Sequence, residues 1–95
     1  MKQTFAIHYR RGPAWLAGKS VFEQPLQAHL AYMRALVANK TLIFGGPFLD
    51  DSGGLIVVDV AGAHEASELA QNDPAVLERI MVAEPHPWKL LAGAW

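Results

Sequence analysis

The spacing of hydrophobic residues switches between the period of a strand and the period of a helix along this chain, and this switching limits the folds open to it. In residues 3–9, apolar and polar side chains alternate, as in a strand with one buried face. In residues 21–39, apolar positions recur at steps of three and four, the spacing of an amphipathic helix. Pro25 disfavours helical geometry at the residue before it, so we expect the regular helix to begin near Pro25. We expect Asn39 to end this helix in the left-handed conformation.

Two further strands and a turn follow this helix. Residues 41–44 are a short apolar run that stops at a Gly-Gly-Pro sequence, and residues 55–60 are rich in β-branched side chains. The Asp-Asp-Ser-Gly-Gly sequence at 50–54 has the residue types of a turn. Together these segments predict a β-hairpin.

The rest of the chain predicts a second helical region and a last strand. Residues 63–71 return to helical spacing. Asp73 followed by Pro74 predicts the N-cap and the first position of a short helix that includes residues 75–78. Residues 79–84 alternate weakly and predict a strand, which the prolines that follow either place at a sheet edge or end.

The predicted order, β-α-β-β-α-β, is that of a ferredoxin-like α+β fold, in which a four-stranded antiparallel sheet carries both helices on one face. With 95 residues, we expect one domain, residues 1–95. The strand at 55–60 is apolar on both sides except at Asp59, and so short a chain has no third layer to cover the second side. We therefore expect a homodimer formed through the exposed sheet face, with the apolar tail at 88–95 near the contact.

Composition argues against several classes of function. Only 18% of the residues are charged and the net charge is −1, which argues against a nucleic-acid partner bound through its phosphates. The absence of cysteine removes disulfides, thiolate nucleophiles and cysteine-based metal sites. Neither a signal peptide nor an apolar run long enough to span a bilayer is apparent, so we expect a cytoplasmic protein with no membrane partner.

His29 is the most informative ionisable residue, because helical spacing places it between Leu26 and Met33 on the stripe that faces the core. One interpretation is a core histidine bonded to a backbone carbonyl. The other is a buried imidazole that acts as a general acid or base in a pocket between helix and sheet. Asp73 is in the first place a helix cap, although its carboxylate can also orient an imidazole. Sequence spacing alone does not bring the two side chains together.

Two other groups of residues are candidates for the wall of such a pocket. The Gly-Gly-Pro sequence is either a simple bulge or turn, or a backbone wall with N–H groups open to an oxyanion: Gly45, Gly46 and Pro47. His8 lies on the polar side of the first strand, and it would line the same cavity as His29 if that side faces the helices. The four histidines lack metal-chelating spacing and no nucleotide-binding glycine loop is present, so we expect no metal and no cofactor.

Several short sequences, taken in their order along the chain, resemble the YCII-related family. They are Gln27-Ala28-His29-Leu30, Leu42-Ile43-Phe44-Gly45-Gly46-Pro47, Ala70-Gln71-Asn72-Asp73-Pro74, and the late Pro85 and Lys89. The resemblance implies a ferredoxin-like fold that pairs into a dimeric α+β barrel. It also implies an active site made of His29 and Asp73 in a small pocket. An activity associated with that family is the dehydrochlorination of a chlorinated hydroxyquinol.

We therefore favour a cofactor-independent enzyme of lyase or isomerase type, with dehydrochlorinase-like chemistry as one form. His29 would move a proton on a small cyclic or aromatic organic substrate, and Asp73 would orient His29 and stabilise its charged form. The expected substrate-binding residues are His8, Gly45, Gly46 and Pro47. Two alternatives stay open: a module that binds a small molecule without turning it over, and a dimerisation module in which the His29 and Asp73 side chains are structural.

Overall fold

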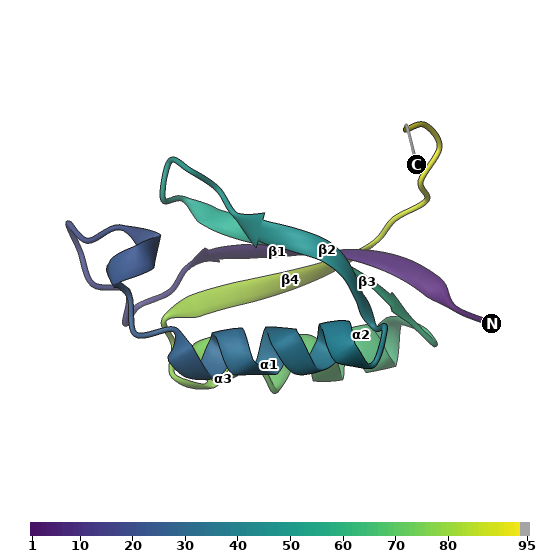
Figure 1. Cartoon of the computed structure of the whole chain (residues 1–95), viewed down its shortest axis with the longest axis horizontal. Helices are drawn as coiled ribbons and strands as arrows, with labels where there is room; N and C mark the ends of the chain where they lie inside the picture. Colours follow the sequence, from purple (N-terminus) through teal and green to yellow (C-terminus); the bar gives the residue numbers. More distant parts are fainter. Residues whose placement is uncertain (94–95) are drawn as a thin grey trace.

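The computed structural model describes residues 1–93, which build a sheet with its helices on one face (Figure 1). The elements follow in the order β1 (Gln3–Arg11), the 3-10 turn η1 (Val21–Glu23), α1 (Gln27–Ala38), β2 (Leu42–Pro47), β3 (Gly53–Val60), α2 (Ala63–Gln71), α3 (Pro74–Leu77) and β4 (Met81–Pro87). All strand pairings are antiparallel, and the order in the sheet is β2-β3-β1-β4. The α+β, ferredoxin-like architecture expected from the sequence is confirmed.

The alternation in β1 separates a face that packs against the helices from a face that does not. Phe5, Ile7 and Tyr9 are each at most 2% exposed and belong to the core under the helices. Their neighbours across the ladder include Val58 and Ile56 of β3, which are also buried. Each fully buried side chain of this kind stabilises the fold by about 1.5–3 kcal/mol. The helices that carry residues of the site pack against this core.

Helix α1 begins at Gln27, two residues after Pro25, so the predicted start is confirmed. Fewer side chains of α1 pack against the sheet than helical spacing predicted. Only the side chains on the side of the helix that faces the sheet reach the core. Leu30 and Val37, which the spacing includes, are 50% and 56% exposed. The partly buried side chains are His29, Tyr32, Met33 and Leu36.

The end of α1 differs from the prediction. Asn39 keeps a negative φ of −91°, and Lys40 takes the left-handed conformation with φ 66°. The side-chain oxygen of Asn39 instead accepts the backbone N–H of Thr41 at 3.0 Å. Asparagine commonly forms such a turn with the backbone two residues on. Asn39 therefore stabilises the turn through its side chain.

The Gly-Gly-Pro sequence does not stop β2, as the sequence analysis expected, but continues it. Gly45 and Gly46 pair with β3, and the ladder runs to Pro47. A Cβ at Gly45 would lie 2.6 Å from the carbonyl oxygen of Leu55, so glycine is what lets these two strands approach there. Because β2 is an edge strand, a proline at its end breaks no central hydrogen bond of the sheet.

The strand β4 lies at the other edge of the sheet, which is the first of the two outcomes that its prolines predicted. It runs through Pro85 to Pro87, three residues beyond the predicted end at residue 84. Residues 88–93 follow without regular structure, and residues 94–95 of the predicted apolar tail lie outside the described residues. In residues 1–93, no helix has the length and apolar character needed to cross a bilayer.

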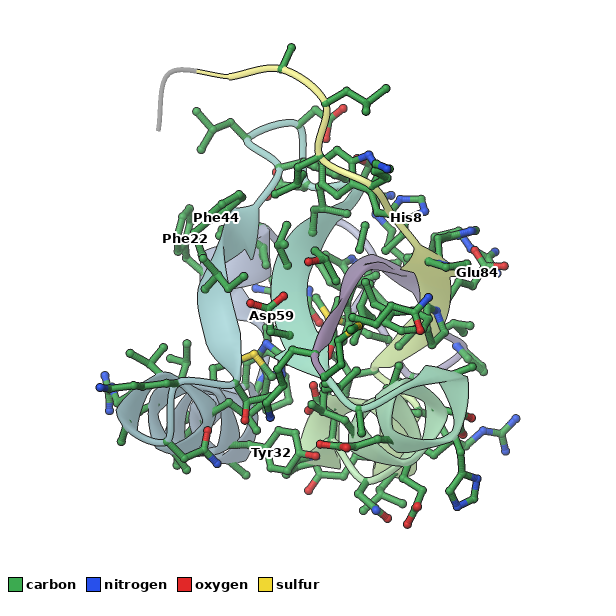
Figure 2. The ribbon with its side chains drawn as sticks, turned by 90° about the vertical axis from the view of Figure 1, so that its right-hand side faces the viewer. His8, Phe22, Tyr32, Phe44, Asp59 and Glu84 are labelled. Carbon is green, nitrogen blue, oxygen red and sulfur yellow. The ribbon has the colours of Figure 1, made fainter. Side chains whose placement is uncertain are left out.

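The sheet face away from the helices carries polar and aromatic side chains. In Figure 2 the helices lie at the bottom, and the labelled His8, Phe44 and Glu84 lie on the strands above them. The register places His8 beside Glu84 on this outer face. The hydroxyl of Thr4 donates to Asp59 at 2.7 Å on the same face. The two sides of the sheet therefore differ in chemistry, and the candidate site belongs to the helix side.

Candidate active site

Asp73 is the N-cap of α3, as its position before Pro74 predicted. Its Oδ1 accepts the backbone N–H of Ala75 at 2.9 Å. The Asp73 side chain is fully buried. A carboxylate withdrawn from water is stable only where hydrogen-bond donors or positive charge compensate its own charge, and the cap supplies one such donor.

His29 supplies a second donor from the first turn of α1, which lies beside α3 on the helix side of the sheet (Figure 1). Its Nδ1 lies 2.9 Å from both carboxylate oxygens of Asp73. Because the carboxylate accepts, Nδ1 carries a hydrogen, and Nε2 holds the lone pair when the ring is neutral. The partner of His29 is therefore a carboxylate and not the backbone carbonyl of the simpler interpretation.

Tyr9, a residue that sequence reasoning did not single out, supplies a third donor. Its hydroxyl donates to Asp73 Oδ2 at 2.6 Å, and its ring meets the His29 ring edge-on with 5.6 Å between centroids. Burial, and then the Asp73 carboxylate, raise the pKa of Tyr9 far above its ordinary value, so the phenol keeps its proton. The available signal was the alternation itself, because Tyr9 shares the buried side of β1 with Phe5 and Ile7 and a buried phenol needs a polar partner.

A cavity of about 290 Å³ lies beside the His29 ring, between the start of α1, η1 and the adjoining ends of β2 and β3. Side chains of Leu26, the N-cap of α1, of Leu30 on α1, and of Val21 and Phe22 on η1 make much of its apolar wall. None of the described wall residues is a lysine, arginine, aspartate or glutamate. The titratable side chains among the described wall residues are therefore the imidazole of His29 and the phenol of Tyr9.

Of the four residues predicted to line a pocket, the structure places two in the wall of this cavity. Gly46 and Pro47 line the cavity, whereas Gly45 packs against β3 and is not part of the wall. His8 does not belong to this wall either, because the polar side of β1 faces away from the helices. Its Nδ1 instead lies 4.0 Å from a carboxylate oxygen of Glu84 on the outer face.

The segment before α1 holds Phe22 at the cavity, a residue that sequence reasoning did not single out. Gln24 is 5% exposed, and its amide exchanges hydrogen bonds with the backbone of Leu16 at 2.8 and 3.1 Å. The backbone N–H of Val21 donates to Asp51 Oδ1 at 2.9 Å, which ties the segment to the β2–β3 turn. Phe22 itself is 77% exposed, so its ring stands between the cavity and the surroundings.

The other histidines lie apart from this site. His64 is on α2, where its Nε2 lies 2.8 Å from Glu68, and both side chains are exposed. In the part of the chain that the structure describes, no group of three or more His, Asp or Glu side chains is arranged to hold a metal ion. The site therefore consists of the His29–Asp73 pair, Tyr9 and the apolar cavity.

The ferredoxin-like fold of this chain agrees with what comparison with known proteins shows. The YCII-related domain matches residues 4–85, and the chain belongs to that family. An uncharacterized protein, YjpA of Bacillus subtilis (strain 168), is 31% identical over 68 residues, which are 72% of this chain and 80% of that protein.

A solved structure is also similar. It is the 5-chloro-2-hydroxyhydroquinone dehydrochlorinase TftG from Burkholderia phenoliruptrix AC1100, in complex with 2,5-dihydroxybenzoquinone. The two structures agree with a TM-score of 0.71 and 25% sequence identity, over 90% of this chain and 93% of that chain. The likeness covers nearly the whole of both chains, so it includes both the sheet and the helices that carry the site.

Proposed function

We propose that this chain is a cofactor-independent enzyme of lyase or isomerase type, in which His29 transfers a proton on a small cyclic or aromatic organic substrate. The observation that carries the proposal is the 2.9 Å contact between His29 Nδ1 and the buried Asp73, made by a ring that also lines an apolar cavity. A histidine that is held by a carboxylate and open to a pocket has the arrangement of a general base.

The proton transfer follows from the tautomer. With Nδ1–H bound to Asp73, the lone pair on Nε2 accepts a proton from a C–H or O–H group of the substrate. Two outcomes are then possible for the electron pair of the broken bond to hydrogen. It forms a double bond while a leaving group departs with its bonding electrons, or it stays on the substrate until the proton returns at a second atom. The first path is an elimination and the second an isomerisation. In both, Asp73 stabilises the imidazolium.

The cavity favours an uncharged or weakly charged ring as substrate. Its wall offers apolar side chains and strand-end backbone, with no lysine or arginine among the described wall residues to bind a carboxylate or phosphate. The similar dehydrochlorinase was solved with a dihydroxybenzoquinone, a ring of this size class. That likeness supports a small quinone-like or phenol-like substrate.

We propose, as a second part of the same function, that two copies pair through the outer face of the sheet. Phe44 is 56% exposed and Val82 is 36% exposed on this side, and the ring of Phe48 lies 6.0 Å from that of His8. Apolar groups exposed together on one sheet face are typical of an interface. Light scattering or sedimentation at micromolar concentration should give twice the chain mass, and a stable monomer would contradict the pairing.

The catalytic proposal is tested by a screen of chlorinated and hydroxylated ring compounds for loss of chloride, isomerisation and hydration. Against the best substrate, His29→Ala should lower turnover by roughly 10²–10⁴-fold, because it removes the general base. Asp73→Asn should also lower turnover, since the amide can cap α3 but cannot stabilise the imidazolium.

The matched control is His64→Gln, which removes an exposed histidine from α2 and should leave turnover unchanged. Full turnover by the His29 variant would contradict catalysis by this residue. Ligand binding to the cavity without turnover in any of the reactions would instead support a module that binds a small molecule, which the presence of the apolar cavity favours as the second candidate.

A further inference from the structure

We propose that Tyr9 is a positioning residue that sets how strongly Asp73 holds the proton on His29. The proposal rests on the proposed role of His29 as the group that transfers a proton, and it adds a third member that acts through Asp73. It concerns the strength of the base and not the identity of the substrate.

Three hydrogen-bond donors share the Asp73 carboxylate. Oδ1 of Asp73 accepts the Ala75 N–H at 2.9 Å, and Oδ2 accepts the Tyr9 hydroxyl at 2.6 Å. His29 Nδ1 lies 2.9 Å from each oxygen, so it competes with both donors for the same negative charge. A donor to a carboxylate withdraws charge from it, and the Tyr9 bond is the shortest of the set.

The hydrogen bond from Tyr9 to Asp73 does not change with pH near neutrality, because the Tyr9 phenol keeps its proton there. Burial comes first and the Asp73 carboxylate second in raising the pKa of Tyr9. The phenol therefore stays protonated and remains a donor to Asp73. Its ring also rests edge-on against His29, at an interplanar angle of 68°. The hydroxyl and the ring therefore have separable roles, the first electrostatic and the second one of packing.

Few other groups face the imidazole. From β1 there is Tyr9 and from the start of α3 there is Asp73, while the described wall residues of η1, β2 and β3 carry no titratable side chain. On α1 itself, Tyr32 points its hydroxyl to the backbone oxygen of Leu69 at 2.8 Å and not to Asp73. Burial, and then Asp73, raise the pKa of Tyr32, so it too stays neutral. Removing the Tyr9 hydroxyl consequently removes one donor to Asp73 and leaves the other groups that face the imidazole in place.

The first experiment is an NMR titration of the histidine rings in wild type, Tyr9→Phe and Tyr32→Phe. Phenylalanine keeps the ring against His29 and removes only the donor to Asp73. The titration midpoint of His29 should rise by about 0.5–1 pH unit in Tyr9→Phe, because a carboxylate with one donor fewer attracts the imidazolium more strongly. Tyr32→Phe removes the same atom from a neighbouring position and should leave the midpoint where it is.

The other three histidines act as internal references, and their midpoints should be the same in all three proteins. A merely structural Tyr9 would lower the stability of the variant and leave the His29 midpoint unchanged. That result, or an equal shift in Tyr32→Phe, overturns the proposal.

A second arm does not depend on Tyr9→Phe folding. The chain has two tyrosines, so in Tyr32→Phe the Tyr9 side chain is the remaining phenol. Growth on 3-fluorotyrosine then places a more acidic phenol, and a stronger donor, at this position alone. The His29 midpoint should move down relative to the unfluorinated Tyr32→Phe protein. An upward shift or no shift overturns the proposal.

These titrations need no substrate, so their failure is distinguishable from failure of the proposed enzyme function. Full turnover by His29→Ala would contradict the catalytic role of His29, and it would not affect the titration midpoints on which the Tyr9 proposal is tested. Unchanged midpoints, with turnover lost in His29→Ala, would leave His29 catalytic and Tyr9 merely structural.

Discussion

Two histidine–carboxylate pairs of nearly equal length lie on the helix side of this molecule, one where α1 meets α3 and the other on α2. His29 Nδ1 lies 2.9 Å from Asp73 Oδ2, and His64 Nε2 lies 2.8 Å from Glu68 Oε1. The first two side chains are 14% and 0% exposed, whereas the second two are 90% and 60% exposed. Distance does not separate the two pairs, but access to water does.

The difference in burial changes what each contact is worth. Around His64 and Glu68, water replaces either partner at little cost, so the pair is free to form and break. Around Asp73, water is excluded and every donor and acceptor must find a partner within the protein. Each of β1, α1 and α3 therefore contributes one hydrogen-bond donor to the Asp73 carboxylate. The comparison indicates that the fold holds His29 in one orientation, which is what a proton-transfer group requires.

The largest expected effect on stability comes from removing the buried carboxylate. Asp73→Ala deletes the cap of α3 and leaves the Tyr9 hydroxyl and the His29 Nδ1–H without their acceptor. We expect the free energy of unfolding, measured with urea, to fall by about 2–5 kcal/mol. Glu68→Ala is the matched change in the exposed pair. A similar loss in both variants would show that burial is not what distinguishes the pairs.

A smaller effect appears at high pH. The unfolded phenol of Tyr9 ionises near pH 10, while its raised pKa keeps it protonated in the folded protein. The folded state then binds one proton more than the unfolded state, so the stabilisation is complete below about pH 10 and is lost as the pH rises further, by up to about 1.4 kcal/mol per pH unit.

Urea unfolding between about pH 9 and pH 11 should therefore show a shallower decline for Tyr9→Phe than for wild type. The lysines contribute equally to both proteins, and His64→Gln serves as a control whose decline should match wild type. Identical slopes for wild type and Tyr9→Phe would mean that Tyr9 ionises as easily when folded as when unfolded, which contradicts a buried phenol bound to a carboxylate.

The parts of the site differ in how far the sequence could predict them. The alternation in β1 and the Asp-Pro sequence are local signals, so the division of the strand into an apolar and a polar face and the cap at Asp73 followed from them. The inward direction of His29 followed from helical spacing. Its contact with Asp73 joins residues 44 positions apart, and it entered the sequence analysis only through the family resemblance.

Other features depend on choices that periodicity leaves open. The contact between Tyr9 and Asp73 joins residues 64 positions apart, so no local pattern shows it. His8 illustrates the same limit, because alternation separates two faces of β1 without saying which of them the helices cover. The burial of Phe5, Ile7 and Tyr9 decided that question against His8 as a wall residue.

The smallest expected effect comes from the exposed pair itself. His64 and Glu68 are four residues apart on α2, and pairs at this spacing contribute about 0.3–0.5 kcal/mol when both groups are charged. Here the histidine precedes the glutamate, which is the less favourable order relative to the helix dipole, and alanine is a slightly better helix former than glutamate. Glu68→Ala should therefore change the free energy of unfolding by no more than about 0.5 kcal/mol in either direction. The contribution of the ion pair to this change should shrink further at high salt, which screens exposed charges. A loss that is larger than this and unaffected by salt would mean that α2 depends on Glu68 for more than a surface contact, and the contrast with Asp73 would then lie in the number of donors and not in burial.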